Sequence, residues 1–177
     1  MKKLLGLVLL ATGLMASTAI NAQKMDEDKS KRPSPPAIAS QKIESGATIT
    51  IDYSQPSVKG RTIGKEIEPM DGQVWRTGAN EATVFETDKD LTIQGQKLPA
   101  GKYSLFTLFI GDTATVIFNK TSKQWGAFKY NAAEDALRVK ADLSAASSPS
   151  EKMTFNISPT GEINLLWGNR KVTFTAK

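Results

Sequence analysis

The residues best suited to chemistry gather within positions 74–83, where Arg76, Asn80 and Glu81 flank a Gly-Ala pair. Small residues predict a tight bend, and the bend would return Arg76 over Glu81 to form a bidentate arginine–carboxylate pair. As a binding site, Arg76 would hold an anionic or sugar-hydroxyl group while Asn80 and Glu81 direct it through hydrogen bonds. As structure, the interpretation that we favour, the three side chains satisfy buried backbone groups beside Trp75.

A second polar group lies upstream and comprises Asp52, Tyr53 and Arg61. Asp52 falls on the polar face of an alternating segment, and it would meet Glu81 if the later loop crosses this segment. Two carboxylates could then flank a glycosidic bond or coordinate calcium. The alternative, which we favour, is a set of polar caps for the turn before Pro56.

Five aromatic residues are of the type that a sugar-binding face uses: Trp75, Tyr103, Trp125, Tyr130 and Trp167. A position in the core or at its edge is the favoured interpretation for each of them. Trp125 follows a polar loop and adjoins a glycine, so it is the best candidate for a half-exposed platform.

The 177 residues include no cysteine and no histidine. There is accordingly no disulfide framework, no thiolate and no imidazole base. Catalysis would have to use carboxylates, lysine, tyrosine or a hard ion such as calcium. We therefore expect a binding protein rather than an enzyme, predict no cofactor and assign no metal ligand.

The first 22 residues have the plan of a secretory signal peptide, with a basic start, an apolar stretch over 4–20 and small residues up to Ala22. Cleavage after Ala22 would leave no transmembrane span and would place the protein in the periplasm or cell envelope. The net charge of +5 is mild, and no basic cluster stands beside a recognition helix, so we expect no nucleic-acid partner.

Residues 23–46 are polar and proline-rich, and we predict a disordered lead-in. From 47 onward, apolar and polar residues alternate with the period of half-buried strands. The predicted strands are 47–53, 83–87, 91–94, 102–109, 114–118, 124–130, 137–143, 152–157, 163–167 and 172–174.

Three local features join these strands. We predict one turn of helix capped by Asn131, a small-residue loop over 144–150 and a tight hairpin at 168–170. About ten short strands at this spacing predict an all-β protein, with residues 47–177 forming a single antiparallel β-sandwich or jelly-roll-like domain.

Four blocks in order resemble a known family: residues 52–61, 74–83, 98–106, and 116–120 followed by Gln124-Trp125-Gly126. This pattern is similar to the family called domain of unknown function 2911. The resemblance implies an exported, β-rich bacterial domain, and it implies no activity.

The leading functional hypothesis is a non-catalytic binding module for a glycan, an envelope component or a protein partner. Arg76, Asn80, Glu81, Asp52, Tyr53, Arg61 and Trp125 are its candidate ligand contacts. The alternatives are a carboxylate-dependent hydrolase of envelope glycans, using Glu81 and Asp52, and a structural envelope module.

Overall fold

The computed structural model describes residues 28–177, and the expected signal peptide lies outside this part of the chain. Within it there are ten β-strands and two single-turn 3-10 helices. In order they are η1 Lys29–Lys31, β1 Pro36–Lys42, β2 Thr48–Ser54, β3 Val74–Trp75, β4 Thr83–Thr87, β5 Leu91–Ile93, β6 Gln96–Leu98, β7 Gly101–Ile110, β8 Thr113–Asn119, η2 Ala132–Glu134, β9 Asp135–Ile157 and β10 Glu162–Thr175.

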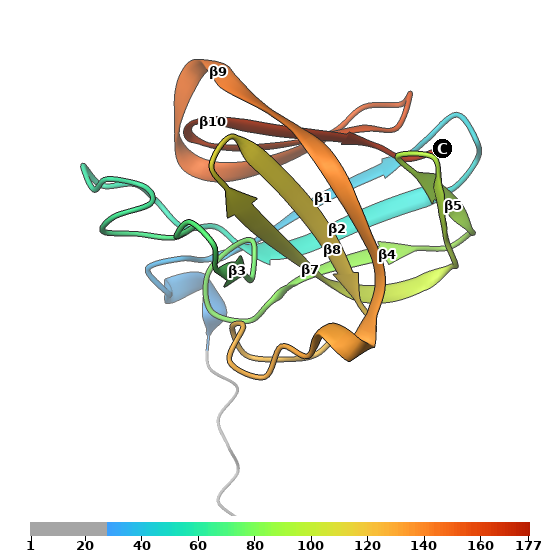
Figure 1. The fold of residues 1–177 in the computed structure, drawn as a ribbon, viewed down its shortest axis with the longest axis horizontal. Helices are drawn as coiled ribbons and strands as arrows, with labels where there is room; N and C mark the ends of the chain where they lie inside the picture. The colour runs from blue at the N-terminus through green and yellow to red at the C-terminus, as the bar shows by residue number, and fades with distance from the viewer. Residues whose placement is uncertain (1–27) are drawn as a thin grey trace, which may run out of the picture.

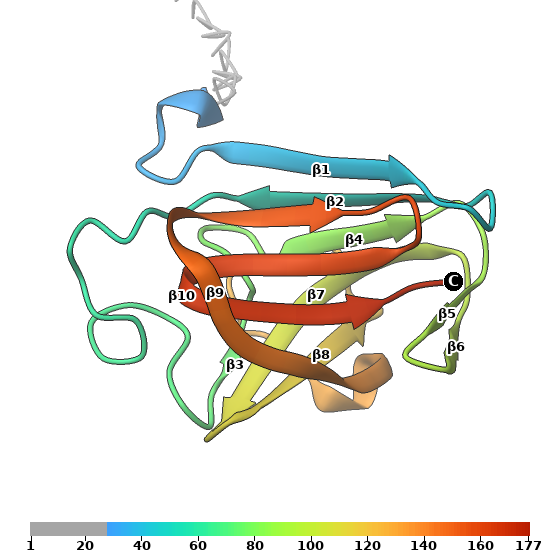
Figure 2. The same ribbon diagram turned by 90° about the horizontal axis from the view of Figure 1, so that it is seen from above.

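One antiparallel sheet follows the order β1-β2-β4-β7-β8-β9-β10, and β3 adds to β7. Strands β5 and β6 form a separate hairpin. The sheet curls: β9 leaves β8 and carries the long β9–β10 ribbon over the face formed by β2, β4 and β7 (Figures 1 and 2). Across this closure, Lys152 of β9 pairs with Ser57, just beyond β2. The predicted all-β, sandwich-like fold is confirmed.

The main core fills the space between these two layers. Alternation places Ile49, Ile51 and Tyr53 of β2 inside, as the sequence predicts. Phe118 of β8 makes edge-to-face contacts with Phe85 and Phe174 from two other strands, with ring centroids 5.0 and 6.2 Å apart. Such pairs add to the stabilisation from burial alone.

A smaller cluster lies on the outer face of β7 and β8. Phe106 and Ile117 are buried there beneath the loop after β8, whose Tyr130 meets Phe106 edge-to-face at 5.0 Å. This loop covers the outer side of β7 and β8 but leaves that of β2 and β4 open, where Asp52 and Val84 reach solvent. The outer side of β2 and β4 therefore remains accessible to solvent.

The predicted disordered lead-in over 23–46 is wrong in the part that the structure describes. Strand β1 lies within it and pairs with β2 at seven positions. Its Ala37 and Ala39 pack against the main core. The backbone hydrogen bonds between β1 and β2 stabilise β1 although its side chains bury little apolar surface. The domain therefore begins before residue 47.

The predicted strand over 124–130 is also wrong, because its spaced aromatic residues do not follow a sheet. Only one isolated bridge forms there, between Trp125 and Glu81. Gly126, at a φ of 62°, then turns the chain, and Phe128 is left exposed. The helical turn capped by Asn131 is confirmed as η2, with the Asn131 side chain accepting from Ala133 N.

The C-terminal strands are longer than predicted. Neither the loop over 144–150 nor the hairpin at 168–170 exists, because β9 and β10 run through both segments as one ribbon. Register shifts on either side of Gly168, whose φ is 56°, let the ribbon bend without ending. The turn that joins the two strands lies at 158–161, between the predicted strands 152–157 and 163–167, as the sequence predicts.

Candidate functional site

The open part of the sheet carries a row of side chains across three strands. The register places Ile38 of β1 beside Asp52 of β2, and Asp52 beside Val84 of β4. Because paired residues in antiparallel strands project to the same face, these three side chains form one surface. Asp52 thus stands between two apolar neighbours.

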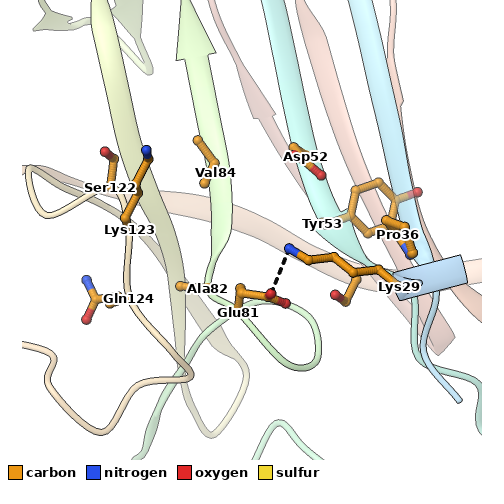
Figure 3. A pocket seen from close by; sticks show the side chains of 11 residues that line it. Lys29, Pro36, Asp52, Tyr53, Glu81, Ala82, Val84, Ser122, Lys123 and Gln124 are labelled. Atoms are coloured by element: carbon orange, nitrogen blue, oxygen red, sulfur yellow. Dashed lines mark ion pairs between the residues drawn. The ribbon is translucent and has the colours of Figure 1, made fainter. Parts of the chain in front are cut away.

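Two segments rise beside this row and turn it into a cleft of about 490 Å³ (Figure 3). One wall comes from η1 and the start of β1, and the other from the loop after β8. The lining residues are Lys29, Pro36, Asp52, Tyr53, Ser54, Glu81, Ala82, Val84, Ser122, Lys123 and Gln124. Ser104 of β7, buried below this loop, donates to Thr121 O at 2.7 Å and holds the second wall in place.

A second cleft of about 230 Å³ adjoins the first and shares four lining residues with it, Asp52, Val84, Ser122 and Lys123. It continues the depression towards Ile38, Thr50, Glu86 and Lys102. We call the two clefts together the outer groove. An ion pair of 2.9 Å between Lys102 and Glu86 fixes its far end.

Glu81 lies in the outer groove but does not pair with Arg76, so that prediction is wrong. Its carboxylate instead receives Lys29 Nζ at 3.0 Å and Arg32 Nη1 at 2.9 Å (Figure 3 shows the first pair). Burial acts to raise the pKa of Glu81, but the Lys29 hydrogen bond and the charges of Lys29 and Arg32 outweigh it and lower that pKa. Glu81 is therefore a firmly ionised group.

Asp52 has the opposite electrostatic setting. Partial burial raises its pKa above the ordinary value, against the attraction of Lys29, and the nearby charge of Glu81 raises it further. The groove thus contains both Asp52 and Glu81, the two carboxylates predicted as a possible pair. Their surroundings shift the two pKa values in opposite directions.

The loop between β3 and β4 explains where the other predicted residues go. Thr77 and Asn80 both have positive φ, 51° and 57°, and Trp75 is buried beneath the loop, donating from Nε1 to Gly78 O at 3.0 Å. Asn80 donates from Nδ2 to Ser34 O at 3.0 Å, so it fastens the N-terminal segment. Arg76 does not line the outer groove and lines a different pocket.

Tyr53 and Arg61 serve the fold. The Tyr53 ring is buried against Phe155, 5.1 Å away edge-to-face, and burial raises the pKa of its hydroxyl. Arg61 donates to Val58 O at 3.0 Å and to Ser57 O at 2.7 Å, which secures the turn after β2. Neither presents its polar group to the outer groove.

Trp125 is the one candidate aromatic that lies open to solvent, with 54% of its surface exposed. The bridge to Glu81 sets it at the Glu81 end of the outer groove, and the Arg32 guanidinium lies 5.9 Å from its ring centroid. Trp75, Tyr103 and Trp167 are buried as expected. The hydroxyl of Tyr130 donates to Asp135 at 2.6 Å, and burial together with that carboxylate raises the pKa of Tyr130 to about 12.

Sequence reasoning missed Lys29 and Lys123, which supply the cations of the larger cleft. Lys29 falls in the segment interpreted as disordered, and Lys123 in a polar loop without a pattern. Ile38 was missed as well, because Ala37, Ile38 and Ala39 are all apolar and show no alternation of apolar and polar residues.

Two kinds of feature are absent from the described residues. Residues 28–177 hold no cluster of three or more acidic, His or Cys side chains able to bind a metal ion. In the same part of the chain, none of the helices has the length and apolar character needed to cross a membrane.

The curled sheet and the outer groove define an all-β, sandwich-like domain with an open polar cleft on one face. The family described as "Protein of unknown function (DUF2911)" matches residues 34–176, and the chain belongs to this family. The match begins just before β1, in agreement with β1 as part of the domain. Comparisons with curated proteins and with solved structures found no match.

Proposed function

We propose that this chain is an exported protein whose domain binds a glycan in the outer groove without transforming it. The observation that carries the proposal is the continuity of the groove: two clefts share four lining residues and run across three strands. An open, elongated depression suits a chain-like ligand better than a compact one, because such a ligand gains contacts along its whole length.

The chemistry of the groove suits sugar hydroxyl groups. Hydroxyls both donate and accept, and the lining offers ammonium donors from Lys29 and Lys123, carboxylate acceptors from Asp52 and Glu81, and the side-chain amide of Gln124. Two cations balance two anions, so an uncharged ligand meets no net repulsion. Apolar atoms of the floor can contact the CH groups of a sugar ring.

Trp125 extends this surface at the Glu81 end. Its exposed indole provides a flat apolar face, and aromatic rings with one wet side are frequent at binding surfaces. The Arg32 guanidinium, paired with Glu81, lies over this ring, 5.9 Å from its centroid. A sugar would therefore stack on the part of the exposed indole that Arg32 does not cover.

Export is supported by the sequence of residues 1–22, which has the three parts of a signal peptide. A periplasmic or cell-envelope location would place the groove among polysaccharides. Detection of the protein in the periplasmic fraction, with an N-terminus at Gln23, would agree with this location, and retention in the cytoplasm would contradict it.

The test is a binding screen with soluble oligosaccharides from bacterial envelope polysaccharides, followed by calorimetry on any that bind. Val84→Trp fills the groove floor from an outward-facing position and should weaken binding at least about tenfold, a loss of 1.4 kcal/mol. Lys123→Ala should weaken binding several-fold. Lys97→Ala is the matched control, because Lys97 is exposed on β6, away from the outer groove.

A screen with no saturable binding, or binding unaffected by Val84→Trp, would contradict glycan binding in the groove. Capture of a protein or of another envelope component, lost in Val84→Trp, would retain the groove and change the ligand. If groove substitutions alter no interaction at all, the remaining alternative is a structural envelope module.

The opposite pKa shifts of Asp52 and Glu81 favour a second candidate, a carboxylate-dependent glycan hydrolase. Hydrolases of this kind need one carboxyl group that keeps its proton and one that stays ionised, and here Asp52 and Glu81 would take these roles. The check is product release from a bound oligosaccharide. Hydrolysis that persists in both Asp52→Asn and Glu81→Gln excludes this mechanism.

A further inference from the structure

The loop between β3 and β4 also lines a second pocket, which contains the guanidinium of Arg76. Its Nε is buried and has no hydrogen-bond partner within residues 28–177. Burial lowers the pKa of Arg76, and only the more distant charge of Glu68 acts to raise it. Buried charges in folded proteins are nearly always paired, since taking a cation out of water is costly. The buried Nε–H of Arg76 thus lacks the partner that its surroundings call for, while the residue as a whole is partly exposed.

The cavity beside Arg76 has a volume of about 360 Å³, large enough for a small molecule. Trp75 and Trp167 lie in its wall, and Arg61, Glu66 and Glu68 line it as well. Both indole N–H groups are already used: Trp75 donates to Gly78 O at 3.0 Å, and Trp167 donates to Glu68 O at 2.8 Å. The side-chain donors left for a ligand are therefore those of the arginines and the hydroxyl of Ser34.

Glu68 is the obvious internal candidate to neutralise Arg76, but it is held elsewhere. Its carboxylate accepts from Met70 N at 3.0 Å, and the Trp167 hydrogen bond fixes its backbone. No ion pair within 4.0 Å joins Glu68 to Arg76 among the described residues. Arg61 is likewise fixed by its two backbone carbonyls. The walls of the pocket are organised, and the place opposite Arg76 is open.

We propose that this pocket binds a small organic carboxylate, whose two oxygens accept hydrogen bonds from the Arg76 guanidinium. The fork of an arginine matches a planar carboxylate, with two parallel N–H···O bonds. A dianion fits less well, because Glu66 and Glu68 line the same cavity and would repel the second charge. The two arginines and two glutamates of the lining sum to zero, so a singly charged acid brings the pocket to −1 and a dianion would bring it to −2.

The carboxylate could belong to a sugar acid or to the C-terminus of a peptide, and both share this recognition chemistry. The site is separate from the outer groove, since the two cavities share no lining residue. The proposal therefore stands or falls independently of the glycan proposal.

The experiment is a titration of the full chain followed by NMR of the arginine Nε–H groups, at constant ionic strength in chloride. The probes are acetate, glucuronate, an N-acetylated dipeptide with a free C-terminus, and sulfate. We expect a saturable shift of the Arg76 signal with acetate and at least tenfold tighter binding of one larger acid. Preference for glucuronate would identify a sugar acid, and preference for the dipeptide would identify a peptide end.

Two variants and a control complete the test. Arg76→Met keeps a stem of similar shape and should abolish binding without lowering the Tm, and Arg76→Lys should weaken binding at least tenfold because it loses the fork. Arg138→Met is the control. Arg138 pairs with Asp135 and does not line the Arg76 pocket, so this change should leave binding unchanged.

Three outcomes would overturn the proposal. The first is the absence of a saturable shift with any carboxylate. The second is equal binding of sulfate and acetate that survives Arg76→Met, which would be an adventitious ion only. The third is a marked drop of the Tm in both Arg76→Met and Glu68→Gln, which would show that Glu68 is the partner of Arg76 in solution.

Discussion

Glu81 and Arg76 belong to the same short loop, but their surroundings are opposite. Glu81 is partly exposed and receives two cations, at 3.0 and 2.9 Å. Arg76 carries a buried Nε that has no hydrogen-bond partner in the described part of the chain. Both residues are partly exposed, yet Glu81 is doubly paired whereas the buried Nε of Arg76 has no partner among residues 28–177. A ligand would therefore find an unpaired donor at Arg76 but would share Glu81 with Lys29 and Arg32.

The cause of the contrast is the path of the chain. Positive φ values at Thr77 and Asn80 bend the loop, and the side chains at 76 and 81 line different cavities. The partners of Glu81 then come from residues 29–32, far away in sequence. Spacing within a loop therefore says little about ion pairing when a distant segment competes for the same carboxylate.

The largest expected effect on stability comes from Trp75, whose indole anchors the loop between β3 and β4. Trp75 is 2% exposed and holds Gly78 O, so Trp75→Ala should lower the free energy of unfolding by about 3–5 kcal/mol. Trp125→Ala, the matched change at an exposed indole, should alter it by no more than about 0.5 kcal/mol. Urea denaturation of the two variants measures the difference.

Similar losses in the two variants would mean that Trp125 is packed in solution, and the proposed platform would then be lost. A small loss in Trp75→Ala would show that the loop is held mainly by the N-terminal segment, for which Asn80→Ala is the check.

A second, smaller effect distinguishes the two charges directly. Glu81→Ala removes two ion pairs that are partly open to water and should cost about 0.5–1 kcal/mol, less in high salt. Arg76→Met removes a partly buried charge whose Nε has no partner among residues 28–177, and it should leave the free energy of unfolding unchanged or raise it by about 1 kcal/mol. The measurement is urea denaturation at low and high salt. If Arg76→Met is the more destabilising of the two, the contrast drawn above is wrong.

Strand alternation was sufficient to predict most of the sheet. The buried face of β2 follows from a period-two pattern of bulky residues, because one face of this strand must leave water. Strands β7 and β8 are buried on both faces over 103–107 and 116–119, and bulky residues on both faces mark them as strands. The pattern failed for β1, where Ala37 and Ala39 are too small to stand out. It also failed at Gly168, which permits a bulge where the sequence indicates a turn.

The candidate site was harder to predict than the fold. Asp52, Glu81 and Trp125 were identified by residue type, but the groove depends on which segments flank the open sheet, and this follows from tertiary packing. Once η1 and β1 are ordered, Lys29 reaches Glu81, and no local pattern specifies that contact. The separation of Arg76 from Glu81 likewise depends on backbone angles that the sequence leaves open.

The smallest effect is a pH dependence that separates Glu81 from Asp52. The folded-state pKa of Glu81 is lowered, so its contribution to stability is complete above the ordinary value of 4.5 and is lost as the pH falls through the lower folded value. Asp52 has a raised pKa, so its ionisation costs stability once the pH rises past the ordinary value of 3.8. The two carboxylates therefore change stability in opposite directions over the same acidic range.

Melting curves at pH 3 and pH 7 test this opposition. Glu81→Gln should lower the Tm at pH 7 and do so less at pH 3, whereas Asp52→Asn should raise the Tm slightly at pH 7 and leave it unchanged at pH 3. Asp112→Asn is the control, because Asp112 is exposed in the turn between β7 and β8 and should shift neither value. If both variants lower the Tm at pH 7, Asp52 is stabilised in its ionised form. The groove would then hold two structural carboxylates, and the hydrolase alternative would lose its proton donor.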